Sequence, residues 1–98
     1  MNPQLHRELW TSWASLLRSY AAAHGLNSTQ HAVVEVSEDK ITVRHGIHWM
    51  AFTEAALQYE DGTTLPFRLT EHGTAVVESN EEEMDHAAER LAREMMQA

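Results

Sequence analysis

The sequence contains no cysteine among its 98 residues. Neither a disulfide framework nor a thiolate metal site can therefore form. A chain of this length buries about 60–70% of its unfolded surface and can hold one core without such staples. No apolar run approaches the ~20 residues of a membrane-spanning helix, and no basic region followed by an apolar stretch marks a signal peptide. We expect one domain over residues 1–98 in the reducing cytoplasm.

Positive charge is scarce as well. Lysine occurs once, at Lys40, and 7 basic residues stand against 15 acidic ones, for a formal net charge of −8. A surface that binds phosphates needs clustered Lys and Arg side chains to displace counterions. The composition therefore predicts no nucleic-acid partner and no membrane partner, and the acidity favours solubility.

Glycine and proline number only 4 and 2. The sequence has no glycine-rich loop for a phosphate and no serine in a glycine-flanked turn between strand and helix. Two acid pairs, Glu38-Asp39 and Glu60-Asp61, fall in predicted turns, where carboxylates are exposed to solvent and have no special acid–base reactivity. We predict no catalytic residue and no cofactor, which favours a non-catalytic protein.

The longest periodic segment runs from Pro3 to Gly25 and predicts an N-terminal helix. Asn2 and Pro3 suit a helix start, and Gly25 suits its end. The polar residues 27–29 then predict a short loop. The large side chains that share one predicted face of this helix are Leu5, Leu9, Trp13, Leu16, Leu17 and Tyr20.

From residue 31 the apolar period changes from helical to alternating, which predicts strands. Residues 31–36 and 40–45 form a predicted hairpin, and residues 47–52 are apolar on both parities. Residues 53–59 fit a strand or a helical turn, and the hairpin signal after them favours the strand. Further strands are predicted at 65–69 and 75–77, the first of them at an edge or with Pro66 turned away from its neighbour.

The last segment predicts a second helix. Ser79 with Glu82, or Asn80 with Glu83, fits a capping box, and an apolar stripe follows from Met84 to Met95. Because all strand connections are short, the strands must pair antiparallel. We therefore predict an α+β two-layer sandwich with an N-terminal helix, a four- or five-stranded antiparallel meander and a C-terminal helix.

The predicted fold has more large apolar side chains than one small core needs. The apolar arc of the first helix is wider than the usual stripe of about 100°. A surplus of this kind favours an interface, and we predict self-association as a homodimer, with a protein partner as the other use of this surface. The residues predicted for the interface are Trp10, Trp13, Ala14, Trp49 and Phe52.

The number of histidines, 7 in 98 residues, is the compositional oddity of this sequence. His45 and His48 flank a glycine, so both rings could converge on a metal ion, although His45 also fits a half-buried strand position. The sequence thus favours a small acidic adaptor-like interaction module that self-associates. The alternative is a small-ligand or metal-binding domain that uses His45 and His48.

Overall fold

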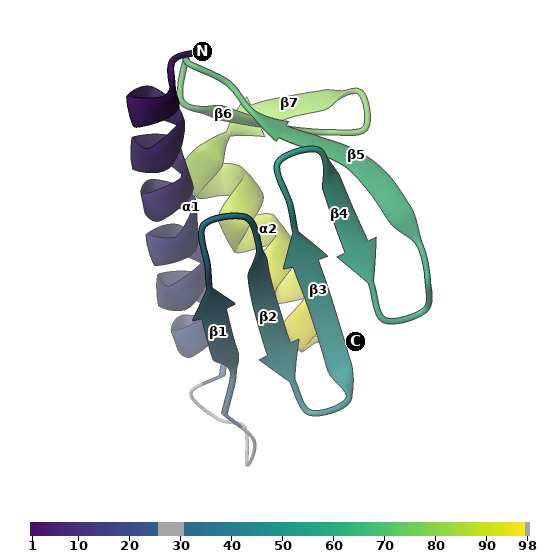
Figure 1. The fold of residues 1–98 in the computed structure, drawn as a ribbon. Coiled ribbons are helices and arrows are strands. Elements are labelled where there is room, and N and C mark those ends of the chain that lie inside the picture. The colour runs from purple at the N-terminus through teal and green to yellow at the C-terminus, as the bar shows by residue number, and fades with distance from the viewer. Residues whose placement is uncertain (26–30, 98) are drawn as a thin grey trace.

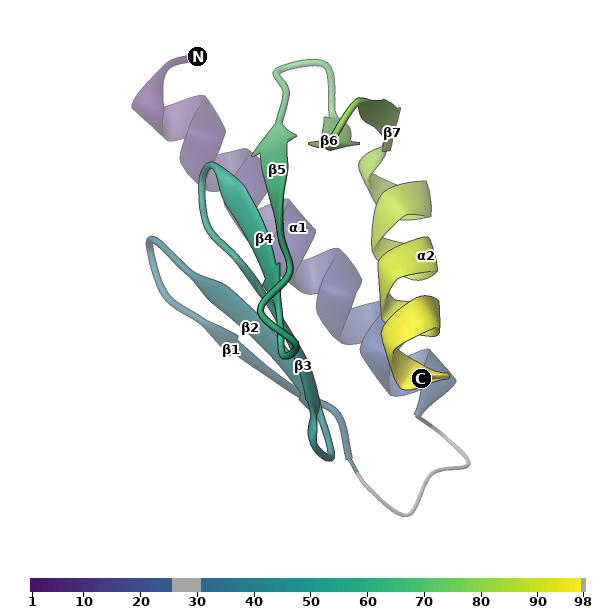
Figure 2. The same cartoon turned by 90° about the vertical axis from the view of Figure 1, so that its right-hand side faces the viewer.

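The computed structural model describes residues 1–25 and 31–97, so the loop predicted at 27–29 lies outside the described residues. The chain forms two layers, an antiparallel sheet and a pair of helices on one of its sides (Figure 1, Figure 2). Helix α1 spans Pro3–His24 and helix α2 spans Met84–Met96. The predicted α+β sandwich is confirmed, with seven strands in the described residues rather than four or five.

The seven strands follow one another across the sheet in chain order, from β1 to β7, each antiparallel to the next. This meander results from short connections, because a tight turn can return the chain only to the adjacent position. The strands are β1 Val33–Val36, β2 Ile41–His45, β3 His48–Phe52, β4 Ala56–Tyr59, β5 Thr64–Leu69, β6 Thr74–Val77 and β7 Asn80–Glu83.

Strand β5 joins two parts of the sheet. Its first half pairs with β4 and its second half with β6, and the views show it crossing between these neighbours (Figure 1). Phe67 N donates to Ala55 O, so alternation turns the nitrogen of Pro66 away from β4. On the β6 side the carbonyl of Pro66 accepts from Glu78 N. Of the two alternatives predicted for this strand, an edge position or a proline turned away from its neighbour, the structure shows the second.

Strand β7 occupies residues that the sequence predicts as the start of the last helix. Glu78 adopts a left-handed conformation, with φ 57°, in the turn between β6 and β7. Residues 80–83 then pair with β6 in register, and α2 begins at Met84 without a side-chain cap. The capping-box prediction is wrong because residues 80–83 pair with β6 as a strand, so the helix begins only at Met84.

Helix α1 is capped as predicted at its start, where Asn2 Oδ1 accepts from Leu5 N at 2.7 Å. It also ends as predicted, with Gly25 as the C-cap residue at φ −92°. A Cβ added at Gly25 would lie 3.1 Å from Ala21 O and 3.2 Å from Met96 Cε. The end of α1 and the end of α2 therefore pack closely.

The buried face of α1 is rotated from the predicted one. The buried residues of α1 are Trp10, Trp13, Ala14, Leu17 and Ala21. The predicted Leu5, Leu9 and Leu16 are only partly buried. The rotation arises because α1 packs against both α2 and the sheet, so its buried stripe must face the angle between them.

The core lies between the helices and the inner face of the sheet. Trp13 contacts Phe52 and Phe67, with ring centroids 5.4 and 5.5 Å apart. Ile41 lies opposite Phe52 and Val43 opposite Met50, so these two cross-strand pairs of β2 and β3 contribute an apolar surface to the core. No helix in residues 1–25 or 31–97 is long and apolar enough to cross a membrane.

Candidate functional site

The two edges of the sheet differ in chemistry. The last strand, β7, has the sequence Asn-Glu-Glu-Glu, and like charges along an edge oppose pairing with another strand. The first strand, β1, has the sequence Val-Val-Glu-Val, with its single charge at Glu35. That carboxylate lies 3.3 Å from Arg44 Nε and is thus partly neutralised. The edge of β1 is therefore the less protected of the two.

Hydrogen bonding shows which backbone groups of β1 face outward. Ser37 N donates to Lys40 O at 2.8 Å, so this pair closes the hairpin between β1 and β2. By alternation Glu35 and Val33 also bond to β2, whereas the N–H and C=O groups of Val34 and Val36 point away from it. Within the described part of the chain, no hydrogen bond to these outward groups is found.

The side chains of β1 leave apolar surface exposed at this edge. Val33 is 50% exposed and Val36 is 41% exposed. The register places Val36 opposite Ile41, on the inner face, and Val33 opposite Arg44, on the outer face. Apolar surface therefore lies on both faces of the edge. The large apolar side chains that are exposed among residues 1–25 and 31–97 are Met1, Val33, Val36 and Ile47.

A hollow of about 590 Å³ lies beside this edge, between the start of α1 and the turn after β1. Trp10 forms part of its wall, with its Nε1 donating to Ser37 O at 2.9 Å and the ring of His6 stacked at 6.0 Å. The turn between β1 and β2 thus covers one side of the Trp10 ring. The residues that line the hollow are Pro3, His6, Arg7, Trp10, Thr11, Val36, Ser37 and Glu38.

The interface residues predicted from the sequence do not form one surface. Trp10 is 5% exposed and Ala14 is 3% exposed, while Trp13 and Phe52 are fully buried in the core of the same chain. Only Trp49 is partly exposed, on the outer face opposite Arg44. The rotated packing of α1 buries within one chain the apolar side chains that the sequence predicted to be a surplus. Sequence reasoning predicted a strand at residues 31–36 but not that this strand forms an exposed edge of the sheet.

The predicted metal ligands His45 and His48 do lie together, as opposite residues that close the turn between β2 and β3. Gly46, with φ 64°, permits this tight turn. The Nδ1 atom of His48 lies 2.5 Å from Glu60 Oε1, so the ring already has a carboxylate partner. Among the residues that the structure describes, no three His, Asp or Glu side chains come together in a way that could hold a metal ion.

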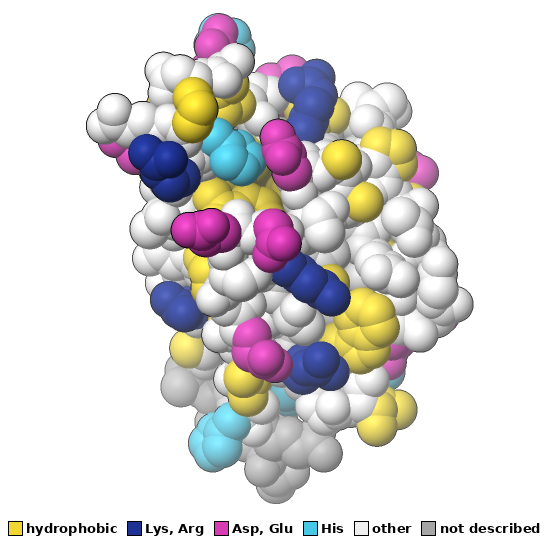
Figure 3. Space-filling model, viewed as in Figure 1, with side chains coloured by type: hydrophobic (Ala, Val, Ile, Leu, Met, Phe, Trp, Pro, Cys, Tyr) yellow, Lys and Arg dark blue, Asp and Glu magenta, His cyan; other side chains and the backbone are white. Residues whose placement is uncertain are grey.

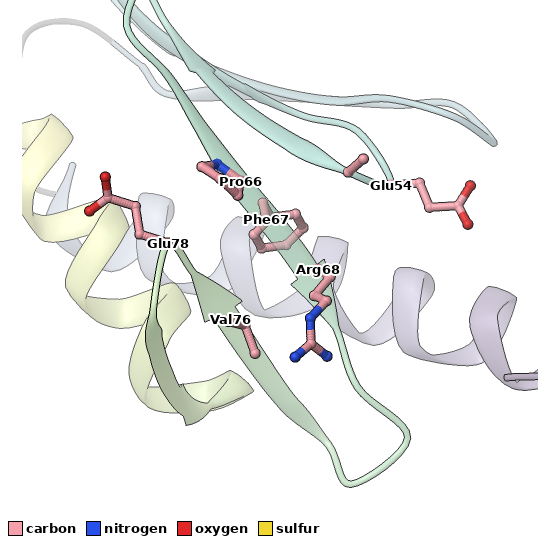
Figure 4. A pocket seen from close by; sticks show the side chains of 7 residues that line it. Glu54, Pro66, Phe67, Arg68, Val76 and Glu78 are labelled. Carbon is pink, nitrogen blue, oxygen red and sulfur yellow. The ribbon is translucent and has the colours of Figure 1, made fainter.

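A second hollow, of about 390 Å³, lies where β5 passes from β4 to β6 (Figure 4). Figure 4 shows Arg68 and Val76 on neighbouring strands, with Glu54 and Glu78 at opposite ends of the site. Its wall mixes apolar and charged groups, and no nucleophile lies beside a base. The residues that line it are Glu54, Ala55, Pro66, Phe67, Arg68, Val76 and Glu78.

The shifted pKa values have structural causes. Hydrogen bonds from Arg90, at 2.6 and 2.9 Å, lower the pKa of Glu82, which connects β7 to α2. Burial raises the pKa of Tyr59, and a hydrogen bond to Asp85 raises the pKa of Tyr20. None of these groups lines either hollow.

The outer face of the sheet carries a mixture of side chains rather than one kind. Figure 3 shows acidic, basic and apolar groups interspersed over this view of the molecule. The fold and surface thus define a two-layer α+β protein with one weakly protected sheet edge. Comparison with known proteins found no matching family model, curated protein or solved structure.

Proposed function

We propose that this protein is a small non-catalytic interaction module that self-associates through the edge of β1. The unequal protection of the two sheet edges carries this proposal: β7 is lined by glutamates, whereas β1 exposes two valines. Natural sheets normally protect an open edge with charge, proline or a covering segment. An edge without that protection is a template for strand addition.

Strand addition at β1 offers two kinds of stabilisation. The outward backbone groups of Val34 and Val36 can pair with a new strand, and each net hydrogen bond contributes roughly 0.5–1.5 kcal/mol. The added strand also removes the exposed side chains of Val33 and Val36 from water. The hydrogen bonds and the apolar burial together offset the free-energy cost of the translational and rotational freedom lost on association.

Charge also favours this part of the surface for contact between two copies. The chain has a formal net charge of −8, so two copies repel each other at most orientations. Helix α1 carries Arg7 and Arg18 against Glu8, and the charge of Glu35 is offset by Arg44. Repulsion is therefore weak beside β1 and strong beside β7.

The test places proline at an outward-facing N–H on each edge. Val34→Pro removes an N–H that points away from β2, so the hairpin is kept while strand addition is blocked. Glu81→Pro is the matched control, because the N–H of Glu81 faces outward from β7 by the same alternation. Light scattering should give the mass of two chains for the wild type and Glu81→Pro, and of one chain for Val34→Pro.

Urea unfolding of both proline variants provides the control for folding. The proposal fails if the wild type has the mass of a single chain at high concentration. It also fails if Glu81→Pro dissociates the dimer while Val34→Pro leaves it intact.

A further inference from the structure

We infer that two copies pair their β1 strands antiparallel in one register, in which Val34 of one copy lies opposite Val34 of the other and the two-fold axis passes between them. This inference rests on the proposed self-association and adds to it the alignment of the partner. Three features of β1 determine this register: the alternation of its side chains, the direction of its backbone groups and the position of Glu35.

Side-chain alternation limits the choice first. Val34 and Val36 lie on the inner face of the sheet, and Val33 and Glu35 lie on the outer face. When an antiparallel strand extends a sheet, directly opposite residues project from the same face. In a symmetric pair the two-fold axis must therefore pass midway between the two copies of one residue. An axis centred between two consecutive residues of the strand would place inner side chains opposite outer ones.

The outward backbone groups and charge then select one residue. An axis at Val34 pairs Val34 with itself and Val36 with Ala32 of the second copy, so all outward groups of the strand are used. An axis at Glu35 would place two carboxylates directly opposite each other, which is destabilising. An axis at Val33 would leave Val36 without a partner in the described residues. Of these three registers, the one centred on Val34 satisfies both conditions.

This register also has consequences for the surface next to the edge. Ala32, Val34 and Val36 of both copies form one continuous apolar row on the inner face. Figure 1 shows α1 running beside β1, so the two-fold axis brings the α1 helices of both copies to the same side of the joined sheet. The hollow lined by Trp10 and Val36 lies at this junction.

The absence of cysteine makes a direct test available, because a single introduced thiol has no competitor. Opposite residues of a hydrogen-bonded antiparallel pair have Cα atoms about 5.5 Å apart, within disulfide range. We therefore expect Val34→Cys to form a disulfide-linked dimer on mild oxidation, seen by non-reducing electrophoresis. Val33→Cys and Glu35→Cys should each stay at background, because their equivalent Cα atoms are more than about 7 Å apart.

A mixed sample gives an independent result. Val33 of one copy lies opposite Glu35 of the other in this register, so Val33→Cys mixed with Glu35→Cys should cross-link as a heterodimer. A size tag on one variant distinguishes that product. The mixture also tests the register if Val34→Cys fails to fold, which the urea midpoint of its reduced form would show.

The outcomes separate the register from the proposed function. Self-linking of Val33→Cys or Glu35→Cys, with Val34→Cys unlinked, moves the axis and overturns the register while self-association through β1 stands. A wild-type dimer by light scattering with no cross-linking at any of these positions overturns the register and the role of β1. A wild type with the mass of one chain overturns self-association itself.

Discussion

Leu16 and Leu17 are adjacent on α1 and have the same side chain, yet the fold uses them differently. Leu17 is fully buried beneath the sheet and α2, whereas Leu16 is only partly buried. Both belong to the helix face that the sequence predicts to be buried. Their different burial therefore shows that the buried face of α1 is rotated from the predicted one.

Substitution of these two leucines should separate the two faces. We expect Leu17→Ala to lower the free energy of unfolding by about 2–5 kcal/mol, because it loses buried apolar area and leaves a cavity. Leu16→Ala, the matched control, should cost at most about half as much, because solvent already reaches this side chain. Urea unfolding measures both values. Equal costs would contradict the orientation of α1.

At the scale of elements, strand β7 is the part of the fold that depends most on its neighbours. Its sequence is acidic and has low strand propensity, yet it pairs fully with β6. The turn before it places Glu78 at φ 57°, a conformation that costs a residue with a side chain about 1–2 kcal/mol. The strand also holds Glu82 against Arg90 of α2.

The left-handed turn residue offers a test of this strand. We expect Glu78→Gly to raise the free energy of unfolding by about 0.5–1 kcal/mol, since the strain relieved exceeds the entropy that glycine adds to the unfolded chain. Ser79→Gly, one residue along and without a positive φ, should lower it instead. If residues 79–83 began the last helix, as the sequence predicts, Glu78→Gly would bring no gain. Urea midpoints decide between the two.

For the whole molecule, net charge opposes the association that the β1 edge favours. The formal charge of −8 acts between copies at long range, whereas strand pairing and apolar burial act only on contact. Charge repulsion between exposed groups is screened beyond a Debye length of about 10 Å at 0.1 M salt. Added salt should therefore weaken the repulsion between two copies and strengthen their association.

We expect the dimer dissociation constant to fall several-fold as sodium chloride rises from about 0.05 M to about 0.5 M, because salt screens repulsion but leaves backbone pairing intact. Sedimentation equilibrium at each salt concentration measures it. Val34→Pro serves as the control and should have the mass of one chain throughout. A dimer that dissociates as salt is added would instead be held by ion pairs, and the contact would lie away from β1.

Local patterns in the sequence predicted most of the elements. The helix start at Asn2, the hairpin of residues 31–45 and the alternation around Phe67 all depend on neighbours within a few residues. The same patterns brought His45 and His48 together, because only a two-residue turn separates them. The predicted interface, in contrast to these elements, did not depend on neighbours within a few residues. Its residues are far apart in the chain, and their burial depends on how α1 packs.

The sequence by itself determined the two helices, the antiparallel meander and the α+β class, because short-range periodicity and short connections leave few other choices. Only the tertiary structure decided which face of α1 is buried, that residues 80–83 extend the sheet, and that β1 is an open edge. The physical reason is that burial and edge pairing are properties of long-range packing. The contacts that bury Trp10 and expose Val36 come from segments distant in the chain, and no local pattern contains them.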